Sequence, residues 1–191
     1  MDQISKEEIF DKILNLLSEK DFFIIALDGR CGSGKTTFAQ EISEKFNFDV
    51  VHLDDFFLPL ELRTKERLSE IGGNIHYERL FCEVIINLKK KQNFSYKKFD
   101  CKTMTFTKSI NINTNRAVIV EGAYSLRPEF DDIFDLKIFC DVDKALQKER
   151  IIKRNGLENY KNFKKIWIPK EEKYLKSMKI EKKCDYKIFL K

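Results

Sequence analysis

Short apolar runs alternate along the chain with longer segments whose apolar residues recur at helical spacing. The run at residues 22–27 is six uninterrupted hydrophobic residues, too short for a helix and typical of a buried parallel strand. Similar runs predict strands at 50–53, 117–120, 136–139 and 186–189. Helical patterns lie near residues 35–46, 77–91, 143–155 and 169–178. Strands that alternate with helices predict an α/β fold with a mainly parallel sheet and helices on both faces.

Capping residues predict where several helices begin and end. Ser5 and Glu8 form a capping-box pattern at the start of a helix within residues 1–20. Gly156 is expected to cap the C-terminus of the 143–155 helix, and Pro169 is expected at the first position of the last helix. The weakest pattern is at 94–115, which is polar and rich in Lys, Thr and Asn.

Composition narrows the class of protein. The 191 residues include 42% hydrophobic side chains and no repeat or linker, so we expect one domain over residues 1–191. Five scattered cysteines and two distant histidines predict neither a zinc site nor a disulfide framework. The longest apolar run is far below the roughly 20 residues of a membrane span. A net charge of +5 from 36 basic and 31 acidic residues suits a solvated surface better than nucleic-acid binding. These features predict a cytoplasmic protein.

Residues 29–36 read Gly-Arg-Cys-Gly-Ser-Gly-Lys-Thr, which fits the phosphate-binding pattern G-x-x-x-x-G-K-[ST]. Glycines let backbone amides turn toward an anion, and a helix that begins there directs its positive end at phosphates. The alternative is a chance glycine turn, but the pattern lies between a predicted strand and a predicted helix. The predicted ATP-binding residues are Gly29, Arg30, Cys31, Gly32, Ser33, Gly34, Lys35, Thr36 and Thr37.

Particular chemistry is expected of three of these residues. Lys35 can reach the β- and γ-phosphates, and the hydroxyl of Thr36 can ligate Mg²⁺. Cys31 is expected to be an exposed, oxidation-sensitive thiol. The chain has no Asn-Lys-x-Asp motif, which disfavours a GTPase.

Carboxylates follow two of the predicted strands. Asp54 and Asp55 come after the second strand, at the edge of a parallel sheet where ligands bind. One of the two can accept a proton from an attacking hydroxyl or hold Mg²⁺ through water. Glu121 ends the 117–120 strand, in the position of a metal-binding acid. The alternatives are a loop or helix-capping pair and a surface glutamate, while His52 is expected in the core.

Arg150 and Arg154 are four residues apart and share one face of a helix. Arginines there could close over the transferring phosphate and neutralise its developing charge. The alternative is a solvated helix face. We expect a lid at about residues 143–165.

Together these motifs resemble the uridine kinase-like branch of the P-loop kinases, which includes uridine-cytidine kinase, nicotinamide riboside kinase, phosphoribulokinase and bacterial pantothenate kinase. The resemblance covers residues 22–188. Its marks are residues 54–57 (Asp-Asp-Phe-Phe), 73–80 (Gly-Asn-Ile-His-Tyr-Glu-Arg-Leu), 121–125 (Glu-Gly-Ala-Tyr-Ser) and 167–169 (Trp-Ile-Pro) with Glu172 and Tyr174. It implies a three-layer P-loop NTPase fold with a kinase-type lid. It also implies that Asp54 is the general base and a candidate metal ligand, and that Arg150 and Arg154 are the lid arginines.

The resemblance also implies a nucleoside-sized acceptor pocket beneath the lid. The candidate acceptor-binding residues are Asp55, His76, Tyr77, Arg79, Phe99, Asp100 and Tyr124. Two positions depart from the family. His76 stands where the family has a ribose-gripping acid, and residues 99–101 (Phe-Asp-Cys) lack the histidine that follows the family's base-covering segment. Both departures weaken uridine as the acceptor.

The sequence therefore predicts a Mg-ATP-dependent kinase that phosphorylates a small-molecule hydroxyl, first of all the 5′-hydroxyl of a nucleoside such as uridine or cytidine. The alternatives are a kinase for nicotinamide riboside or pantothenate, and a P-loop ATPase or nucleotide-binding regulator. The predicted cofactors are ATP and Mg²⁺. The only expected partner is the small-molecule acceptor, without nucleic acid or membrane, and a homo-oligomer stays open.

Overall fold

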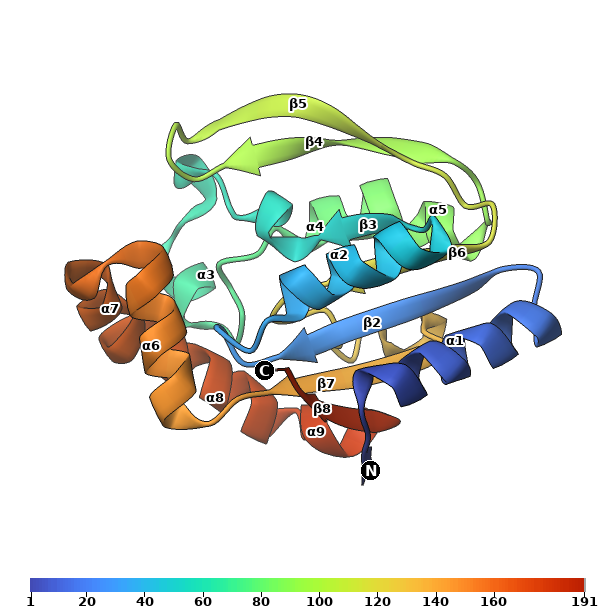
Figure 1. Ribbon diagram of the computed structural model, residues 1–191. Coiled ribbons are helices and arrows are strands. Elements are labelled where there is room, and N and C mark those ends of the chain that lie inside the picture. The colour runs from blue at the N-terminus through green and yellow to red at the C-terminus, as the bar shows by residue number, and fades with distance from the viewer. Residues whose placement is uncertain (191) are drawn as a thin grey trace.

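The computed structural model describes residues 1–190 and is built on a parallel sheet of six strands (Figure 1). Their order across the sheet is β1-β8-β7-β2-β6-β3. The strands are β1 Asp2–Gln3, β2 Phe23–Gly29, β3 Asp49–His52, β6 Ala117–Glu121, β7 Leu136–Asp141 and β8 Tyr186–Phe189. The five predicted strands are all present, with ends that shift by up to two residues. The two-residue edge strand β1 is additional.

The helices are α1 Lys6–Glu19, α2 Lys35–Phe46, α3 Lys65–Ser69, α4 Tyr77–Leu80, α5 Ile86–Lys89, α6 Lys144–Asn155, α7 Leu157–Asn162, α8 Ile168–Ser177 and α9 Ile180–Lys183. Two π-helical turns, Phe81–Ile85 and Phe163–Trp167, join α4 to α5 and α7 to α8. Short 3-10 helices lie at Leu53–Phe56, Leu60–Leu62 and Asp131–Ile133. The capping box of Ser5 and Glu8 and the C-cap at Gly156 are as predicted.

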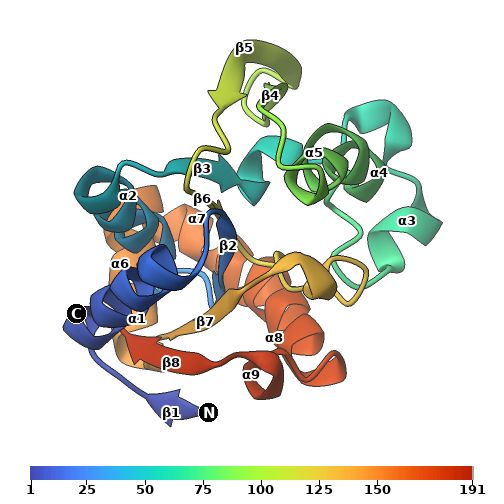
Figure 2. The same ribbon diagram turned by 90° about the vertical axis from the view of Figure 1, so that its right-hand side faces the viewer.

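Helices cover both faces of the sheet, so the fold is the predicted three-layer α/β P-loop architecture (Figure 2). Strand β2 is buried on both sides because its side chains alternate between two cores. Phe23, Ile25 and Leu27 pack with α1 and α2, whereas Ile24 and Ala26 face the core that includes Tyr174 of α8 and residues of α4 and α5.

An antiparallel hairpin, β4 Phe94–Asp100 and β5 Thr105–Ile112, stands beside the edge strand β3 (Figures 1 and 2). The sequence did not predict it, because most side chains of β5 are exposed and the strand lacks alternating apolar positions. Its anchor is Tyr96, which is buried and packs on Phe56 with 4.9 Å between ring centroids.

The last helix does not begin at Pro169. Helical backbone already starts at Leu157 and runs through a π turn into α8, whose first residue is Ile168. The amide of Ile168 bonds to the carbonyl of Phe163, five residues back. Proline has no amide hydrogen and its ring clashes with the preceding turn. The wider π turn accommodates Pro169 within the helical segment, at its second α8 position.

Candidate active site

The phosphate-binding loop joins the end of β2 to the start of α2, as its sequence predicts. The glycines at its two ends have positive φ angles, 135° at Gly29 and 95° at Gly34. Gly34 is the N-cap residue of α2. A Cβ atom at Gly29 would lie 2.0 Å from the carbonyl oxygen of Cys140 on β7. This close approach explains why the loop begins with glycine.

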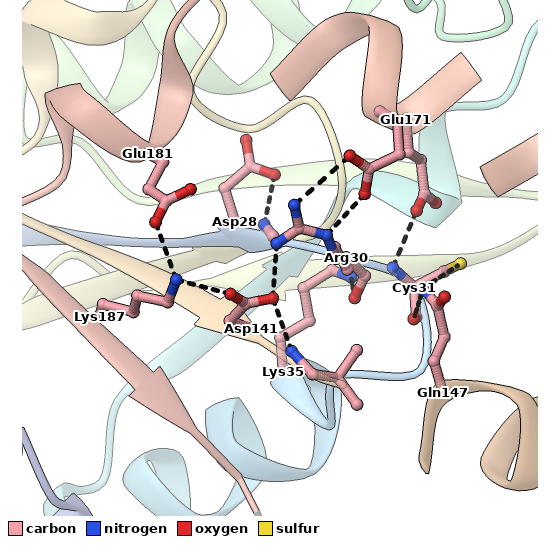
Figure 3. A network of polar contacts seen from close by, with 12 residues as sticks. Asp28, Arg30, Cys31, Lys35, Asp141, Gln147, Glu171, Glu181 and Lys187 are labelled. Carbon is pink, nitrogen blue, oxygen red and sulfur yellow. Dashed lines mark hydrogen bonds and ion pairs between the residues drawn. The ribbon is translucent and has the colours of Figure 1, made fainter. Parts of the chain in front are cut away.

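Side chains of α8 hold the loop from one side (Figure 3). The Arg30 guanidinium pairs with Glu172 at 2.6 Å and with Asp141 at the end of β7 at 2.5 Å. The next residue, Cys31, donates its amide hydrogen to Oε2 of Glu171 at 2.8 Å. Two consecutive acids of α8 therefore fix two consecutive residues of the loop.

Side chains of helix α6 hold the same loop by donating hydrogen bonds to the carbonyl oxygens of the loop. Gln147 donates to the carbonyl oxygen of Cys31 at 2.9 Å (Figure 3). Arg150 donates to the carbonyls of Gly32 and Ser33 at 3.2 and 3.1 Å, and also to that of Leu190 at 2.8 Å. Arg150 lines the cavity, but in this structure its guanidinium braces the loop.

Cys31 is not the exposed thiol that the sequence predicted. Its side chain is buried between the loop and the two helices, with 7% of the residue exposed. Burial and the nearby Glu171 carboxylate raise the pKa of its thiol well above the ordinary value. The thiol is therefore protonated and unreactive at neutral pH.

Lys35 is buried on the floor of the cavity, where its Nζ donates to the carbonyl of Arg30 at 3.2 Å. Burial disfavours its charge, but the carboxylates around it, first Glu171 and then Glu121, outweigh burial and raise the pKa of Lys35. The side chain is a fixed cation at the place where the loop would bind phosphates.

Thr36 and Glu121 come together at the edge of the sheet. Oγ1 of Thr36 donates to Oε2 of Glu121 at 3.3 Å, and Glu121 is buried at the end of β6. A hydroxyl and a carboxylate are ligands that suit Mg²⁺, which typically takes one or two carboxylates together with substrate phosphates. No cluster of three or more His, Cys, Asp or Glu side chains fit to hold a metal lies within residues 1–190. The donor set therefore fits a metal that arrives with a nucleotide.

His52 is not the core residue that the sequence predicted. It is the last residue of β3, its side chain is 37% exposed, and its Nδ1 lies 2.6 Å from Oε1 of Glu121. That hydrogen bond raises the pKa of His52. Residues 52 and 121 are register partners on β3 and β6, so the parallel pairing places both side chains at the same edge.

The neighbouring acids Asp54 and Asp55 point to different surroundings. Asp54 lines the cavity, and within residues 1–190 its carboxylate has no hydrogen-bond partner. The surrounding protein and the charge of Glu121 raise its pKa. Asp55 is buried, accepts the hydroxyl hydrogen of Tyr96 at 3.0 Å and pairs with Nζ of Lys98 at 2.9 Å. Asp55 therefore fastens the hairpin and does not line the cavity.

The cavity above the loop has a volume of about 960 Å³. Lys35, Thr36, Asp54 and Glu121 line its middle. One end extends along α2 toward Leu190, whereas the other lies between the 57–75 segment, the hairpin tip and the start of α8. The volume is ample for a nucleotide and a second small molecule side by side.

Of the residues predicted to bind the acceptor, Tyr124 lines the cavity. It packs on Tyr174, with 4.7 Å between ring centroids, and its hydroxyl is buried without a partner in residues 1–190. Partial burial lowers the pKa of the His76 ring, and His76 lies outside the set of residues that line this cavity.

Four more predicted acceptor residues lie outside the cavity and serve the fold. Tyr77 is buried and its hydroxyl donates to backbone carbonyls, including that of Ile71 at 3.2 Å. Arg79 pairs with Glu83, and its guanidinium lies 4.3 Å from the centroid of the Phe56 ring.

In the hairpin, Phe99 is buried against Phe106, with 5.4 Å between ring centroids. Asp100 accepts the backbone amide hydrogen of Lys102 at 2.7 Å and so shapes the hairpin turn. Both residues form contacts within the hairpin, and neither lines the cavity.

Arg154, the second of the two predicted lid arginines, is exposed and lines the cavity, and its guanidinium lies 5.8 Å from the centroid of the Phe163 ring. Sequence reasoning missed Glu171, which lines the same cavity. Acidic residues are common in the first turn of a helix because their charge interacts favourably with the positive end of the helix dipole. Glu171 in the first turn of α8 therefore gave no distinct signal of a site.

Comparisons with known proteins agree with this geometry. A family model described as NB-ARC domain matches residues 6–56. The uridine kinase of Ureaplasma parvum is 29% identical over 159 residues, which are 78% of this chain and 77% of that protein. A solved structure described as a possible uridine kinase from Bacillus stearothermophilus has a TM-score of 0.64 at 20% identity and covers 95% of this chain and 99% of its own.

A structure described as a proposed fructose transport system kinase from Silicibacter sp. TM1040 has a TM-score of 0.77 at 19% identity, over 96% of this chain and 98% of its own. No helix within residues 1–190 is both long and apolar enough to cross a membrane. The fold, the phosphate-binding loop and the relatives agree on a nucleotide-dependent phosphotransferase with a small-molecule acceptor. The chain is an ATP-dependent kinase, and its sequence and fold are similar to those of uridine kinase-like P-loop kinases.

Proposed function

We propose that the protein transfers the γ-phosphoryl group of Mg-ATP to the 5′-hydroxyl of a nucleoside such as uridine or cytidine. The observation that carries the proposal is the free carboxylate of Asp54, which lines the same cavity as Lys35 and the Thr36–Glu121 pair. A base, a phosphate-binding cation and a metal-binding pair around one cavity are what phosphoryl transfer to an alcohol requires.

Asp54 is the proposed general base. Its carboxylate is not engaged by other side chains, so it is available to accept the proton of an alcohol. The surroundings that raise its pKa also make it a stronger base than an ordinary aspartate. Asp55 is assigned a structural role because Tyr96 and Lys98 occupy its oxygens.

Lys35 is proposed to hold the β- and γ-phosphates, since it is a buried cation on the cavity floor. Thr36 and Glu121 would hold Mg²⁺, with Asp54 as a further oxygen ligand through water. The bound ion would neutralise charge on the phosphates. His52 would position the Glu121 carboxylate through their hydrogen bond.

Arg154 is the stronger candidate to stabilise the transferring phosphoryl group. It is exposed and lines the cavity, and within residues 1–190 its side chain donates one hydrogen bond, to Oδ1 of Asn155 at 2.7 Å. Arg150 already donates to three backbone carbonyls, so it would have to release the loop before it could act on a phosphate.

The nucleoside acceptor is supported by relatives named uridine kinase and by two aromatic side chains at the acceptor end. The rings of Phe57 and Trp167 meet there, with 6.5 Å between their centroids. Aromatic faces suit a planar base. Nicotinamide riboside and pantothenate are the alternative acceptors, since their kinases share the same branch.

Product analysis tests the proposal. The protein is incubated with Mg-ATP and uridine or cytidine, and the products are separated and identified by mass spectrometry. We expect nucleoside 5′-monophosphate in amounts equal to the ADP formed, and loss of both in the Asp54→Asn variant. ADP without a phosphorylated nucleoside would contradict the nucleoside assignment.

A further inference from the structure

The acceptor end of the cavity is lined by three cations that come from three different segments. Arg63 follows the Leu60–Leu62 turn, Lys102 lies at the tip of the β4–β5 hairpin, and Lys170 is on α8. None of the three forms an ion pair with a carboxylate within residues 1–190. A side chain of either sign that lacks a protein partner inside a binding cavity is available to a ligand.

Contacts of Arg63 and Lys170, and the chain position of Lys102, place the three cations at the acceptor end of the cavity. The Arg63 guanidinium lies beside the thiol of Cys101, the residue before Lys102. Across the cavity, Nζ of Lys170 lies 5.9 Å from the centroid of the Trp167 ring, and Trp167 meets Phe57.

Their existing hydrogen bonds leave charge uncompensated. Nε of Arg63 donates to the carbonyl of Leu58 at 2.7 Å, and Nζ of Lys170 donates to that of Leu68 at 3.3 Å. These carbonyls are neutral and occupy one donor of each side chain, whereas a guanidinium has five donors and an ammonium three.

Arginines elsewhere in the fold show the contrast. Four partly or fully buried arginines each pair with a carboxylate, namely Arg30, Arg67, Arg79 and Arg127. Arg150 is the exception among the buried and partly buried arginines elsewhere in the fold, since its partners are the backbone carbonyls of Gly32, Ser33 and Leu190. The cations at the acceptor end have no carboxylate partner among residues 1–190.

Most acids that line the cavity surround other cations. Asp54, Glu121 and Glu171 surround Lys35 on the floor, and Glu41 pairs with Lys6 along α2. Burial raises the pKa of Cys101, which lies beside Arg63, and the carboxylates of Asp54, the proposed base, and Asp100 of the hairpin raise it further. His76 stands where the resemblance implies a ribose-binding acid, and it lies outside the cavity. That position therefore supplies no carboxylate to bind the two hydroxyls of an uncharged ribose.

We propose that the acceptor is an alcohol that also carries an anionic group, a carboxylate or a phosphate, and that Arg63, Lys102 and Lys170 bind this group. The inference rests on the proposed transfer of a phosphoryl group from ATP to an alcohol. An acceptor of this class differs from uridine and cytidine, which carry no anionic group. Lys35, Arg154 and the loop amides remain for the phosphates of ATP, so the three cations are not needed there. The guanidinium of Arg63 has paired N–H donors, which can bind two oxygens of either a carboxylate or a phosphate.

Matched pairs of alcohols that differ in charge test the proposal. Uridine 3′-monophosphate is compared with uridine, and pantothenate with panthenol. Dissociation constants are measured by calorimetry with a non-hydrolysable ATP analogue present, and kcat/KM is measured with Mg-ATP. A charge-assisted contact predicts that at least one anionic compound binds about tenfold or more tightly than its neutral partner. The two pairs separate phosphate from carboxylate as the bound group.

Variants assign the preference to these residues. Arg63→Gln and Lys102→Gln should each reduce the ratio of anionic to neutral binding at least about threefold. Lys165→Gln, an exposed lysine outside the cavity, is the matched control and should leave the preference intact.

Equal or weaker binding of both anionic compounds would overturn the proposal, as would a preference that survives in Arg63→Gln and Lys102→Gln. Failure of the proposed phosphotransfer looks different. In that case no compound would be phosphorylated, or turnover would persist in Asp54→Asn, while the binding measurements would still decide the charge preference.

Discussion

Asp54→Asn and Asp55→Asn form a matched pair of substitutions that should separate catalysis from stability. Both remove one negative charge and keep the side-chain shape. Asp54 lines the cavity without a hydrogen-bond partner in residues 1–190, whereas Asp55 is buried against Tyr96 and Lys98. We expect the first variant to lose turnover and the second to lose stability.

The magnitudes follow from these surroundings. Loss of a general base slows the chemical step about 10²- to 10⁴-fold, which corresponds to about 3 to 5 kcal/mol of transition-state free energy. An amide at position 55 still accepts the Tyr96 hydroxyl but loses the charge pair with Lys98, whose side chain is 43% exposed. A half-exposed pair and a weakened hydrogen bond together stabilise by about 1 to 2 kcal/mol. That lowers the melting temperature by about 2 to 8 °C for a chain of this size.

Steady-state kinetics and thermal melts of both variants measure the two effects, and binding of ATP is followed by calorimetry. Asp54→Asn should bind ATP as the native protein does and melt near the native temperature, since Asp54 is exposed and forms no hydrogen bond or ion pair within residues 1–190. The reasoning is refuted if Asp54→Asn retains near-native kcat, or if Asp55→Asn loses more turnover than Asp54→Asn while melting normally.

Three further predictions concern other residues of the site. Lys35→Ala should reduce turnover about 100-fold or more while circular dichroism stays native, since it removes the cation on the cavity floor; near-native activity would show that the loop does not bind the reacting phosphates. Iodoacetamide should label Cys82 and Cys101, which are exposed, well before the buried Cys31, as peptide mapping by mass spectrometry would detect; early labelling of Cys31 would contradict its burial. Partial burial lowers the pKa of His76 from 6.5, so the folded protein binds fewer protons than the unfolded chain and stability should fall as the pH drops below that value. Melts from pH 7.5 to 5.5 should show a smaller loss in His76→Asn, and an equal loss in both proteins would count against this assignment.

Much of the site could be predicted because it follows from local pattern. The apolar run at 22–27, the glycine loop and the helix after it occur in one continuous stretch, so their relation in space is fixed by chain connection. Asp54 and Glu121 follow adjacent predicted strands, and the edge of a parallel sheet brings such residues together. These predictions needed no knowledge of tertiary packing.

The parts that the sequence did not predict depend on contacts between distant segments. His52 follows Val50 and Val51 on β3, so the apolar run predicts a core position, but the short strand leaves His52 at the sheet edge beside Glu121. Glu171 on α8 accepts the amide hydrogen of Cys31, 140 residues away along the chain, and no local pattern indicates that contact. The hairpin is held by Tyr96 and Asp55, 41 residues apart, and not by its own apolar pattern.

The central claim is phosphotransfer to an alcohol, and ADP release with and without acceptors tests it most directly. The native protein is supplied with Mg-ATP, first alone and then with each member of a panel of nucleosides and anionic alcohols. The structure predicts little ADP release alone and a strong increase with at least one acceptor, which Asp54→Asn abolishes. ADP release of equal rate with and without every acceptor would show that the protein hydrolyses ATP and would contradict the claim.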